Sequence, residues 1–264
     1  MIEARGVEVV FHRGEALETP GLRGVDLQIG AGEFAAVIGS NGAGKSTLLN
    51  VLAGDIAPTA GGVFMDGKNI TAQPAHIRAS RIARVFQDPL AGTCAGLTVE
   101  ENMSLAQSRG KTRGWRRAVS DARRKFFRRR LQDLGLNLEN RLGEKVGQLS
   151  GGQRQAVSLV MATLAESGVL LLDEHTAALD PRMAEFVLEL TRRIASEYGL
   201  AALMVTHSMK AALSCGGRTI MLHRGKIILD ASGEERSKMQ TADLLRLFAQ
   251  TSGGEIDNDR LLLE

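Results

Sequence analysis

Short apolar runs alternate along the chain with segments whose apolar residues recur every three or four positions. The clearest runs lie within 33–39, 169–172 and 200–205, and segments of helical periodicity at 46–53 and 181–199 follow the first two. A short run that is apolar throughout is typical of a strand buried on both faces, as in a parallel sheet covered by helices. The pattern therefore predicts an α/β fold around a mainly parallel sheet.

Weaker patterns complete the predicted architecture. From residue 100 to 138 glycine becomes rare and charge rises, while Phe126, Phe127 and Leu131 recur at helical spacing, so a helical insert is expected there. The remaining expected elements are strands at 61–66 and 84–86, a helix at 153–165, and a hairpin of strands at 218–223 and 226–230.

The composition and the cysteine count place the chain in a broad class. With 44% hydrophobic and 24% charged residues it is expected to fold around a sizeable core. No apolar run approaches the roughly 18–20 residues that cross a bilayer, and Glu3, Arg5 and Glu8 stand where a secretory signal would be apolar. The two cysteines, Cys94 and Cys215, give no disulfide framework, which fits a reducing cytoplasm.

The formal net charge of +3 conceals a basic block, residues 109–130. This block contains eleven Lys or Arg and one acid, Asp121, so it carries +10 and the rest of the chain −7. Such a block is either a solvated helix face or a surface that faces phosphate groups or an acidic partner.

A glycine-rich sequence lies between the first predicted strand and its helix. Residues 39–46, Gly-Ser-Asn-Gly-Ala-Gly-Lys-Ser, match the phosphate-loop pattern G-x-x-x-x-G-K-[ST]. The glycines let backbone N–H groups face phosphate oxygens, Lys45 reaches the outer phosphates, and Ser46 is suited to ligate Mg²⁺. This context makes a glycine-rich turn without function a weak alternative.

Two carboxylates follow the apolar run at 169–172. Asp173 and Glu174 stand at the expected C-terminal end of a strand, where open α/β sheets bind ligands. An acidic loop after a buried strand is common by itself, but with a phosphate loop upstream it predicts a nucleotide site. Asp173 is then expected to hold Mg²⁺, and Glu174 to position and activate the attacking water.

The third motif is Leu-Ser-Gly-Gly-Gln at residues 149–153. With it, the chain resembles an ATP-binding subunit of an ABC transporter, of the bacterial importer type, in which this pentapeptide is the signature. Gln87 is similar to the Q-loop glutamine of that family, residues 178–180 to its D-loop, and His207 to its switch histidine. Phe11 lies where the family has an aromatic residue stacked on adenine; a buried strand residue is the alternative.

The resemblance implies a P-loop NTPase core with a mainly parallel sheet, an N-terminal antiparallel β portion and a helical subdomain insert. Residues 1–235 are expected to form a single ABC ATPase domain, with its core at about 1–87 and 157–230 and its helical subdomain at about 88–156. Residues 236–264 are expected to form a C-terminal tail that is either disordered or packed on the core.

The resemblance also implies an ATPase that uses ATP and Mg²⁺. Its expected catalytic residues are Lys45, Gln87, Glu174 and His207, and its expected metal-binding residues are Ser46, Gln87 and Asp173. The residues expected to bind ATP are Phe11, Gly39, Ser40, Asn41, Gly42, Ala43, Gly44, Lys45, Ser46, Thr47, Ser150, Gly151, Gly152 and Gln153.

The same resemblance implies several partners. Two ATPase subunits are expected to pair head to tail as a homodimer, so that the signature of one covers the γ-phosphate held by Lys45 of the other. A single ATPase domain without membrane spans implies a separate membrane permease and, indirectly, a substrate-binding protein. The chain is then expected at the cytoplasmic face of the membrane, with the helical insert against the permease and the basic block near anionic lipid.

Two other functions share these motifs. An exporter ATPase would carry all of them. A nucleic-acid-directed ABC ATPase would bind phosphates with the basic block, but the repair type has a long coiled coil and the translation type usually has two ATPase halves, so no nucleic acid is expected. Import is preferred, because the run at 173–180 and the long basic insert are similar to importers associated in some cases with aromatic amino acids.

The chain departs from the family at His175, where proline commonly follows the catalytic glutamate. Histidine places a group that titrates near neutral pH beside the expected base, which suggests an unusually pH-dependent activity. The alternative is that His175 merely fills space.

Overall fold

A six-stranded sheet forms the centre of the computed structural model, which describes residues 1–111 and 118–251. Its strand order is β10-β9-β3-β8-β7-β6, and all neighbours are parallel except β10, which pairs antiparallel with β9. The strands are β3 (Phe34–Ile38), β6 (Ile82–Val85), β7 (Val169–Asp173), β8 (Ala201–Val205), β9 (Arg218–His223) and β10 (Lys226–Ser232). The predicted mainly parallel α/β fold is confirmed.

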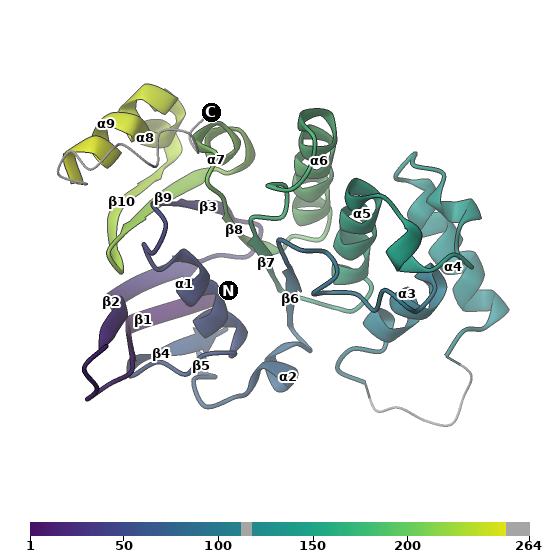
Figure 1. Ribbon diagram of the computed structural model, residues 1–264, viewed down its shortest axis with the longest axis horizontal. Helices are drawn as coiled ribbons and strands as arrows, with labels where there is room; N and C mark the ends of the chain where they lie inside the picture. The colour runs from purple at the N-terminus through teal and green to yellow at the C-terminus, as the bar shows by residue number, and fades with distance from the viewer. Residues whose placement is uncertain (112–117, 252–264) are drawn as a thin grey trace.

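A second, antiparallel sheet lies beside the first at the N-terminal end of the chain (Figure 1). It consists of β1 (Ile2–Phe11), β2 (Thr19–Ile29), β4 (Ala60–Met65) and β5 (Lys68–Asn69) in the order β2-β1-β4-β5. The expected N-terminal antiparallel portion is therefore present, and the strand expected at 61–66 is β4.

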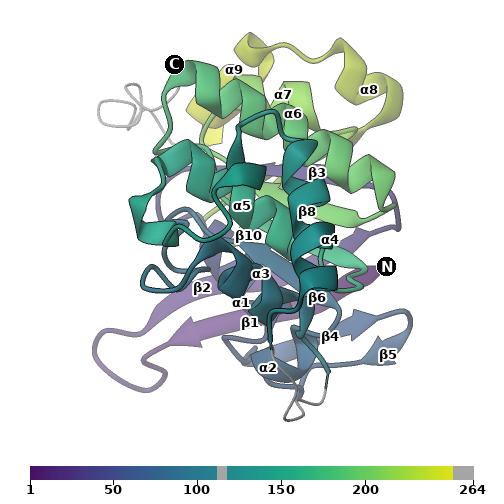
Figure 2. The same ribbon diagram turned by 90° about the vertical axis from the view of Figure 1, so that its right-hand side faces the viewer.

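Alternate residues of the central strands face two different layers. Ala35 and Val37 of β3 belong to the core shared with the antiparallel sheet and α1 (Lys45–Ala53), whereas Ala36 and Ile38 belong to the core formed with the helices of the other face. Figures 1 and 2 show these helices grouped on that side. They include α5 (Gly151–Ala162), α6 (Pro181–Glu197) and α7 (Met209–Cys215). The phosphate-loop helix and the signature helix thus cover opposite faces of one sheet.

The helical insert lies beyond β6. It contains α3 (Val99–Gln107), α4 (Asp121–Gln132) and 3-10 turns at Leu138–Asn140 and Val146–Gln148, and a short helix, α2 (Ala75–Arg78), precedes β6. Phe127 and Leu131 of α4 are fully buried against this layer, as their helical spacing predicts. Residues 112–117, in the middle of the basic block, lie outside the described part of the chain.

Several boundaries differ from the sequence prediction by one to three residues. The strand expected at 84–86 occupies 82–85, and the helix expected at 153–165 begins at Gly151. The earlier start follows from a capping box, in which the Ser150 hydroxyl accepts from the Gln153 N–H and the Gln153 side chain accepts from the Ser150 N–H. The expected subdomain boundary at 156–157 therefore falls within α5.

The C-terminal segment packs on the core as far as Thr251. Helices α8 (Gly233–Lys238) and α9 (Thr241–Thr251) follow β10, and Leu244 and Phe248 of α9 are buried in the helical-face core. Residues 252–264 lie outside the described range. Among the helices that the structure describes, none combines the length and the apolar character needed to cross a membrane.

Candidate active site

The phosphate loop leaves the central strand β3 and enters α1 through backbone conformations that favour glycine. Gly42 and Gly44 have φ of 74° and 102°, in the left-handed region. A Cβ on Gly39 would come within 2.2 Å of the Leu222 carbonyl oxygen, because β9 passes directly beside it. Glycine is therefore required at Gly39 by close packing and at Gly42 by backbone conformation alone.

Lys45 is folded back over this loop. Its side chain is buried, with 5% exposed, and Nζ donates to the carbonyl oxygens of Gly39 and Ser40 at 2.7 and 2.9 Å. Ser46, the next residue, is exposed, and Thr47 is half-buried. The loop thus holds an ammonium group at the start of a helix, where backbone N–H groups and the helix dipole favour an anion.

Glu174 follows the end of β7 in a left-handed conformation, with φ of 43°. Its N–H donates to the carbonyl of Val205 at 3.0 Å, which fixes the residue against the end of β8. Its Oε1 lies 2.6 Å from Nε2 of His207. A non-glycine residue in this conformation is strained, and such strain is typical of functional sites.

The pKa of Glu174 lies below its ordinary value. The hydrogen bond from His207 is the largest cause, and the charges of His207 and Lys45 act in the same direction against the opposing effect of burial. The carboxylate is therefore charged at neutral pH and able to accept a proton. The strands β3, β7 and β8 bring Lys45, Glu174 and His207 into one electrostatic site, as their places at the strand ends predict.

Asp173 is paired with a residue that the sequence analysis did not single out. Nη2 of Arg84, on β6, lies 3.0 Å from Oδ2 of Asp173, and its Nη1 lies 2.7 Å from Oδ2 of Asp55. Asp55, Arg84 and Asp173 are distant in sequence, so no sequence motif indicates that they lie together. The one available signal was a charged residue inside a short, otherwise apolar strand.

His175 does not titrate near neutral pH in the folded protein. It is buried, with 2% exposed, and burial lowers its pKa to about 4. Its Nε2 lies 2.9 Å from the hydroxyl of Thr191, which itself donates to the Val187 carbonyl, so neutral His175 donates this bond. The suggestion of a pH-sensitive neighbour of Glu174 is therefore wrong, because His175 is a neutral packing residue under α6.

The signature residues lie at the start of α5, next to the start of α6. Ser150 is exposed and caps α5, and Arg141 donates to Oε1 of Gln153 at 3.0 Å. A Cβ on Gly152 would overlap the Met183 side chain of α6.

The two remaining candidates lie at the edges of the site. Gln87 is exposed in the bend that follows β6. Phe11, at the end of β1, is half-buried, and a Cβ added to Gly21 would meet its ring at 2.5 Å and the methyl of Thr47 at 3.3 Å. The aromatic ring therefore lies beside the first turn of α1, although it also packs against the core.

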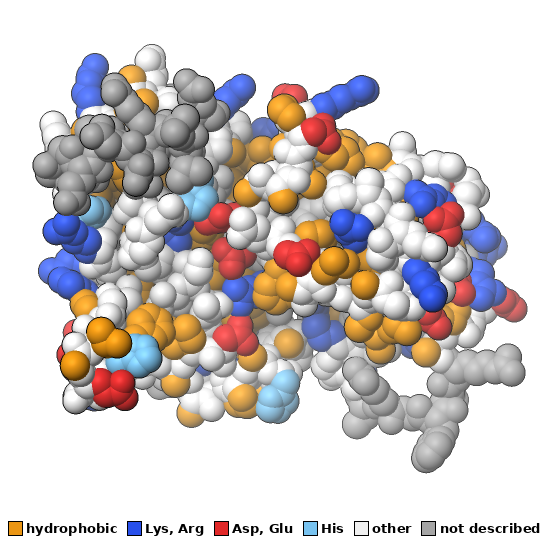
Figure 3. All heavy atoms as spheres, viewed as in Figure 1, with side chains coloured by type: hydrophobic (Ala, Val, Ile, Leu, Met, Phe, Trp, Pro, Cys, Tyr) orange, Lys and Arg blue, Asp and Glu red, His pale blue; other side chains and the backbone are white. Residues whose placement is uncertain are grey.

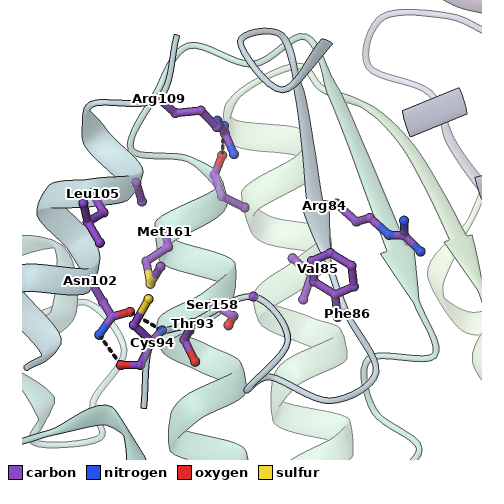
Figure 4. Close-up of a pocket in the computed structure, with 13 residues that line it drawn as sticks. Arg84, Val85, Phe86, Thr93, Cys94, Asn102, Leu105, Arg109, Ser158 and Met161 are labelled. Atoms are coloured by element: carbon purple, nitrogen blue, oxygen red, sulfur yellow. Dashed lines mark hydrogen bonds between the residues drawn. The ribbon is translucent and has the colours of Figure 1, made fainter. Parts of the chain in front are cut away.

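A cavity of about 210 Å³ lies between β6, the segment after it, and helices α3 and α5. Figure 4 shows Asn102 and Leu105 on one side and Ser158 and Met161 of α5 on another. Asn102 accepts from the Cys94 N–H at 2.8 Å and so holds the segment around Cys94 to α3. The cavity is separate from the phosphate loop.

A phosphate loop between a central parallel strand and its helix, with acidic residues at the end of another strand of the same sheet, defines a nucleotide-binding protein of the P-loop class. The chain belongs to the ABC transporter family, whose model matches residues 22–177. The predicted ABC ATPase is confirmed.

Relatives are similar over most of this chain. A tyrosine transport ATP-binding protein of Clostridioides difficile is 44% identical over 224 residues, or 85% of this chain and 89% of that protein. A lipoprotein-releasing system ATP-binding protein of Caulobacter vibrioides is 35% identical over 233 residues, or 86% and 94%. The dimeric post-hydrolysis state of the ATP-binding cassette MJ0796, bound to ADP and Pi, matches with a TM-score of 0.76 and 31% identity, over 88% of this chain and 98% of that one.

Proposed function

We propose that this chain hydrolyses ATP to drive the import of an amino acid, in particular an aromatic one, through a separate membrane permease. The observation that carries the catalytic part is the 2.6 Å contact between Glu174 and His207 beside Lys45. The 44% identity to a tyrosine transport ATP-binding protein supports the substrate class.

The residues of the site have distinct roles in this proposal. The N–H groups of residues 39–47 and the Lys45 ammonium bind the phosphates, and the Phe11 ring stacks on the adenine. Glu174 accepts the proton of the attacking water, and His207 orients Glu174 and keeps it ionised. Phosphoryl transfer depends mainly on positioning and charge neutralisation, which is what this arrangement supplies.

Mg²⁺ would be held by the hydroxyl of Ser46, the carboxylate of Asp173 and the amide oxygen of Gln87. This donor set fits the ion, because Mg²⁺ prefers oxygen ligands and is usually held by one or two protein groups together with substrate phosphates. When bound, the ion would neutralise the charge of the transferring phosphate.

Two chains pair head to tail around ATP. Because α1 and α5 cover opposite faces of the central sheet, the exposed signature end of α5 is available to a second subunit. Ser150 and the N–H groups at the start of α5 then contact the γ-phosphate bound by the partner subunit. The match to a dimeric cassette supports this arrangement.

The permease contacts the helical insert, at the cavity between β6, α3 and α5. Phe86, the residue before Gln87, lines this cavity. A permease segment bound in the cavity is therefore adjacent to Gln87, one of the proposed metal-binding residues. Figure 3 shows Lys and Arg side chains, with some Asp and Glu among them, at the edge of the molecule where α4 lies, and α4 itself carries six Lys or Arg. This basic edge faces the anionic cytoplasmic surface of the membrane.

Release or export of a substrate is the second candidate, because a lipoprotein-releasing system protein is 35% identical. Both candidates are tested by one experiment. Tagged Glu174→Gln is trapped with ATP and Mg²⁺ in its native membranes, and the proteins that co-purify after nuclease treatment are identified. An importer-type permease supports the proposal, and an exporter-type permease supports the second candidate.

Glu185→Gln, an exposed glutamate on α6, is the matched control and should not trap the complex. Recovery of nucleic acid or ribosomes without a membrane protein, from a sample not treated with nuclease, would overturn both candidates. Uptake of labelled tyrosine, phenylalanine and tryptophan by cells that lack the chain tests the substrate class.

A further inference from the structure

Arg84 lies between two carboxylates at the metal side of the proposed nucleotide site. Its side chain is 14% exposed, and it forms ion pairs with Asp55 at 2.7 Å and Asp173 at 3.0 Å. Asp55 follows the end of α1, so the three residues join the phosphate-loop helix, the edge strand β6 and the strand β7. We refer to them as the Asp55–Arg84–Asp173 cluster.

The charges of this cluster cancel only in part. Two carboxylates and one guanidinium give a net charge of −1, the same as Asp173 alone. Arg84 places its positive charge on the carboxylate that is proposed to hold Mg²⁺, and like charges repel. Asp55 offsets that repulsion, since it pairs with the other side of the same guanidinium. The cluster therefore sets the attraction of Asp173 for a cation.

Arg84 also contacts the segment that carries Gln87. Its guanidinium carbon lies 4.6 Å from the centre of the Phe86 ring. The Phe86 carbonyl accepts from Nε2 of Gln155 on α5 at 3.2 Å. Figure 4 shows Arg84 extending away from the Asn102 and Leu105 side of the cavity. A change in the pairing of Arg84 therefore acts directly on Phe86, which lines the cavity and precedes Gln87 in the chain.

We propose that Arg84 is a positioning residue that competes with Mg²⁺ for Asp173 and links the occupancy of that carboxylate to the Gln87 segment. The inference rests on the proposed function. With Asp173 paired to Arg84, the Arg84–Phe86 stacking holds the segment in the observed conformation. When Asp173 binds the cation instead, Arg84 remains paired with Asp55 alone, and the stacking of Arg84 on Phe86 changes.

The test compares the affinity for a fluorescent, non-hydrolysable ATP analogue with and without Mg²⁺, and takes the ratio of the two. Arg84→Gln gives the cluster a net charge of −2, so the Mg²⁺-dependent gain in affinity should rise at least threefold. Asp55→Asn leaves Arg84 paired to Asp173 alone, so the gain should fall at least threefold. The double variant restores −1 and should return close to the wild-type ratio.

The control is Arg81→Gln, which removes an arginine just before β6 that pairs with Asp66 at the surface. It should leave the ratio unchanged. A lower ratio for Arg84→Gln, or no change in either single variant, would overturn the proposed competition. If the wild type binds no ATP analogue at all, the proposed function fails instead.

The link to the Gln87 segment has its own readout. Cys94 is exposed in the cavity wall, whereas Cys215 is buried, so a thiol reagent reports on Cys94 selectively. In the wild type with the ATP analogue bound, adding Mg²⁺ should change the rate of Cys94 modification at least twofold. In Arg84→Gln the rate should be the same with and without Mg²⁺, and a persistent twofold change would refute the link.

Discussion

Nε2 of His207 lies 2.6 Å from Oε1 of Glu174, and the two residues follow adjacent parallel strands. The register pairs Asp173 of β7 with Val205 of β8, so both side chains emerge just beyond the last paired positions. The sheet itself therefore brings the proposed base and its partner together, and the hydrogen bond keeps the pKa of Glu174 low.

Removing this partner should shift the pH dependence of hydrolysis. In His207→Ala the largest cause of the lowered pKa of Glu174 is lost, while burial continues to raise it. The acid limb of the kcat profile should therefore move to higher pH, and kcat should fall about 100-fold. Steady-state ATPase rates between pH 5 and 9 test this, with the exposed His76→Ala as control. An unmoved acid limb would contradict the role given to His207.

His175 should make the fold, not the activity, sensitive to acid. Its pKa is about 4 in the folded protein against 6.5 ordinarily, so the unfolded chain binds the proton first as the pH falls. The free energy of unfolding should therefore decline between pH 6.5 and 4, by up to about 3 kcal/mol from this group. His175→Gln should remove that part of the decline, as measured by urea unfolding at several pH values.

The same residue gives a second check. His175→Pro and the wild type should have matching pH–rate profiles above about pH 5.5, because His175 is already neutral there. Profiles that diverge near pH 7 would show that the histidine affects Glu174 directly.

The two glycines of the phosphate loop should respond differently to alanine. At Gly42 nothing lies within 4 Å of a new Cβ, so Gly42→Ala should cost only the left-handed conformation, about 1 kcal/mol of the free energy of unfolding. At Gly39 the Cβ meets the Leu222 carbonyl, so Gly39→Ala should cost about 2–3 kcal/mol and weaken ATP binding. Equal losses in urea unfolding would argue against this packing.

Neighbouring phenylalanines in α4 offer a matched pair for the helical insert. Phe127 is fully buried and Phe126 is 41% exposed. Phe127→Ala should lower the free energy of unfolding by about 3–5 kcal/mol, whereas Phe126→Ala should lower it by less than about 1 kcal/mol. Thermal and urea unfolding of both variants test whether α4 is an integral part of the fold.

The buried strands and the ends of the sheet were predictable because their signals are local. A continuous apolar run predicts β3, β7 and β8, and functional residues at strand ends must then converge, which places Lys45, Glu174 and His207 together. The start of α5 was misplaced because the capping box belongs to residues that the apolar periodicity does not include.

The environments of Arg84, Asp173 and His175 were not predicted from the sequence, because they depend on contacts between segments that are distant in the chain. Arg84 and Asp173 are 89 positions apart, and only the pairing of β6 with β7 brings them together. The low pKa of His175 similarly arises from burial under α6. A sequence reveals that such a residue is ionisable, but its environment is decided by packing.

The two segments that are proposed to contact ATP and its metal ion differ in how firmly the sheet holds them. β3, which carries the phosphate loop, has a paired strand on each side, whereas β6, which leads to Gln87, is an edge strand paired only with β7. Backbone amides in β3 should therefore exchange with solvent only on global unfolding, while those of β6 should exchange through local opening. The proposed phosphate-binding loop thus leaves a strand that is held on both sides, and the Gln87 segment, which is proposed to respond to the nucleotide, follows a strand that is held on one side.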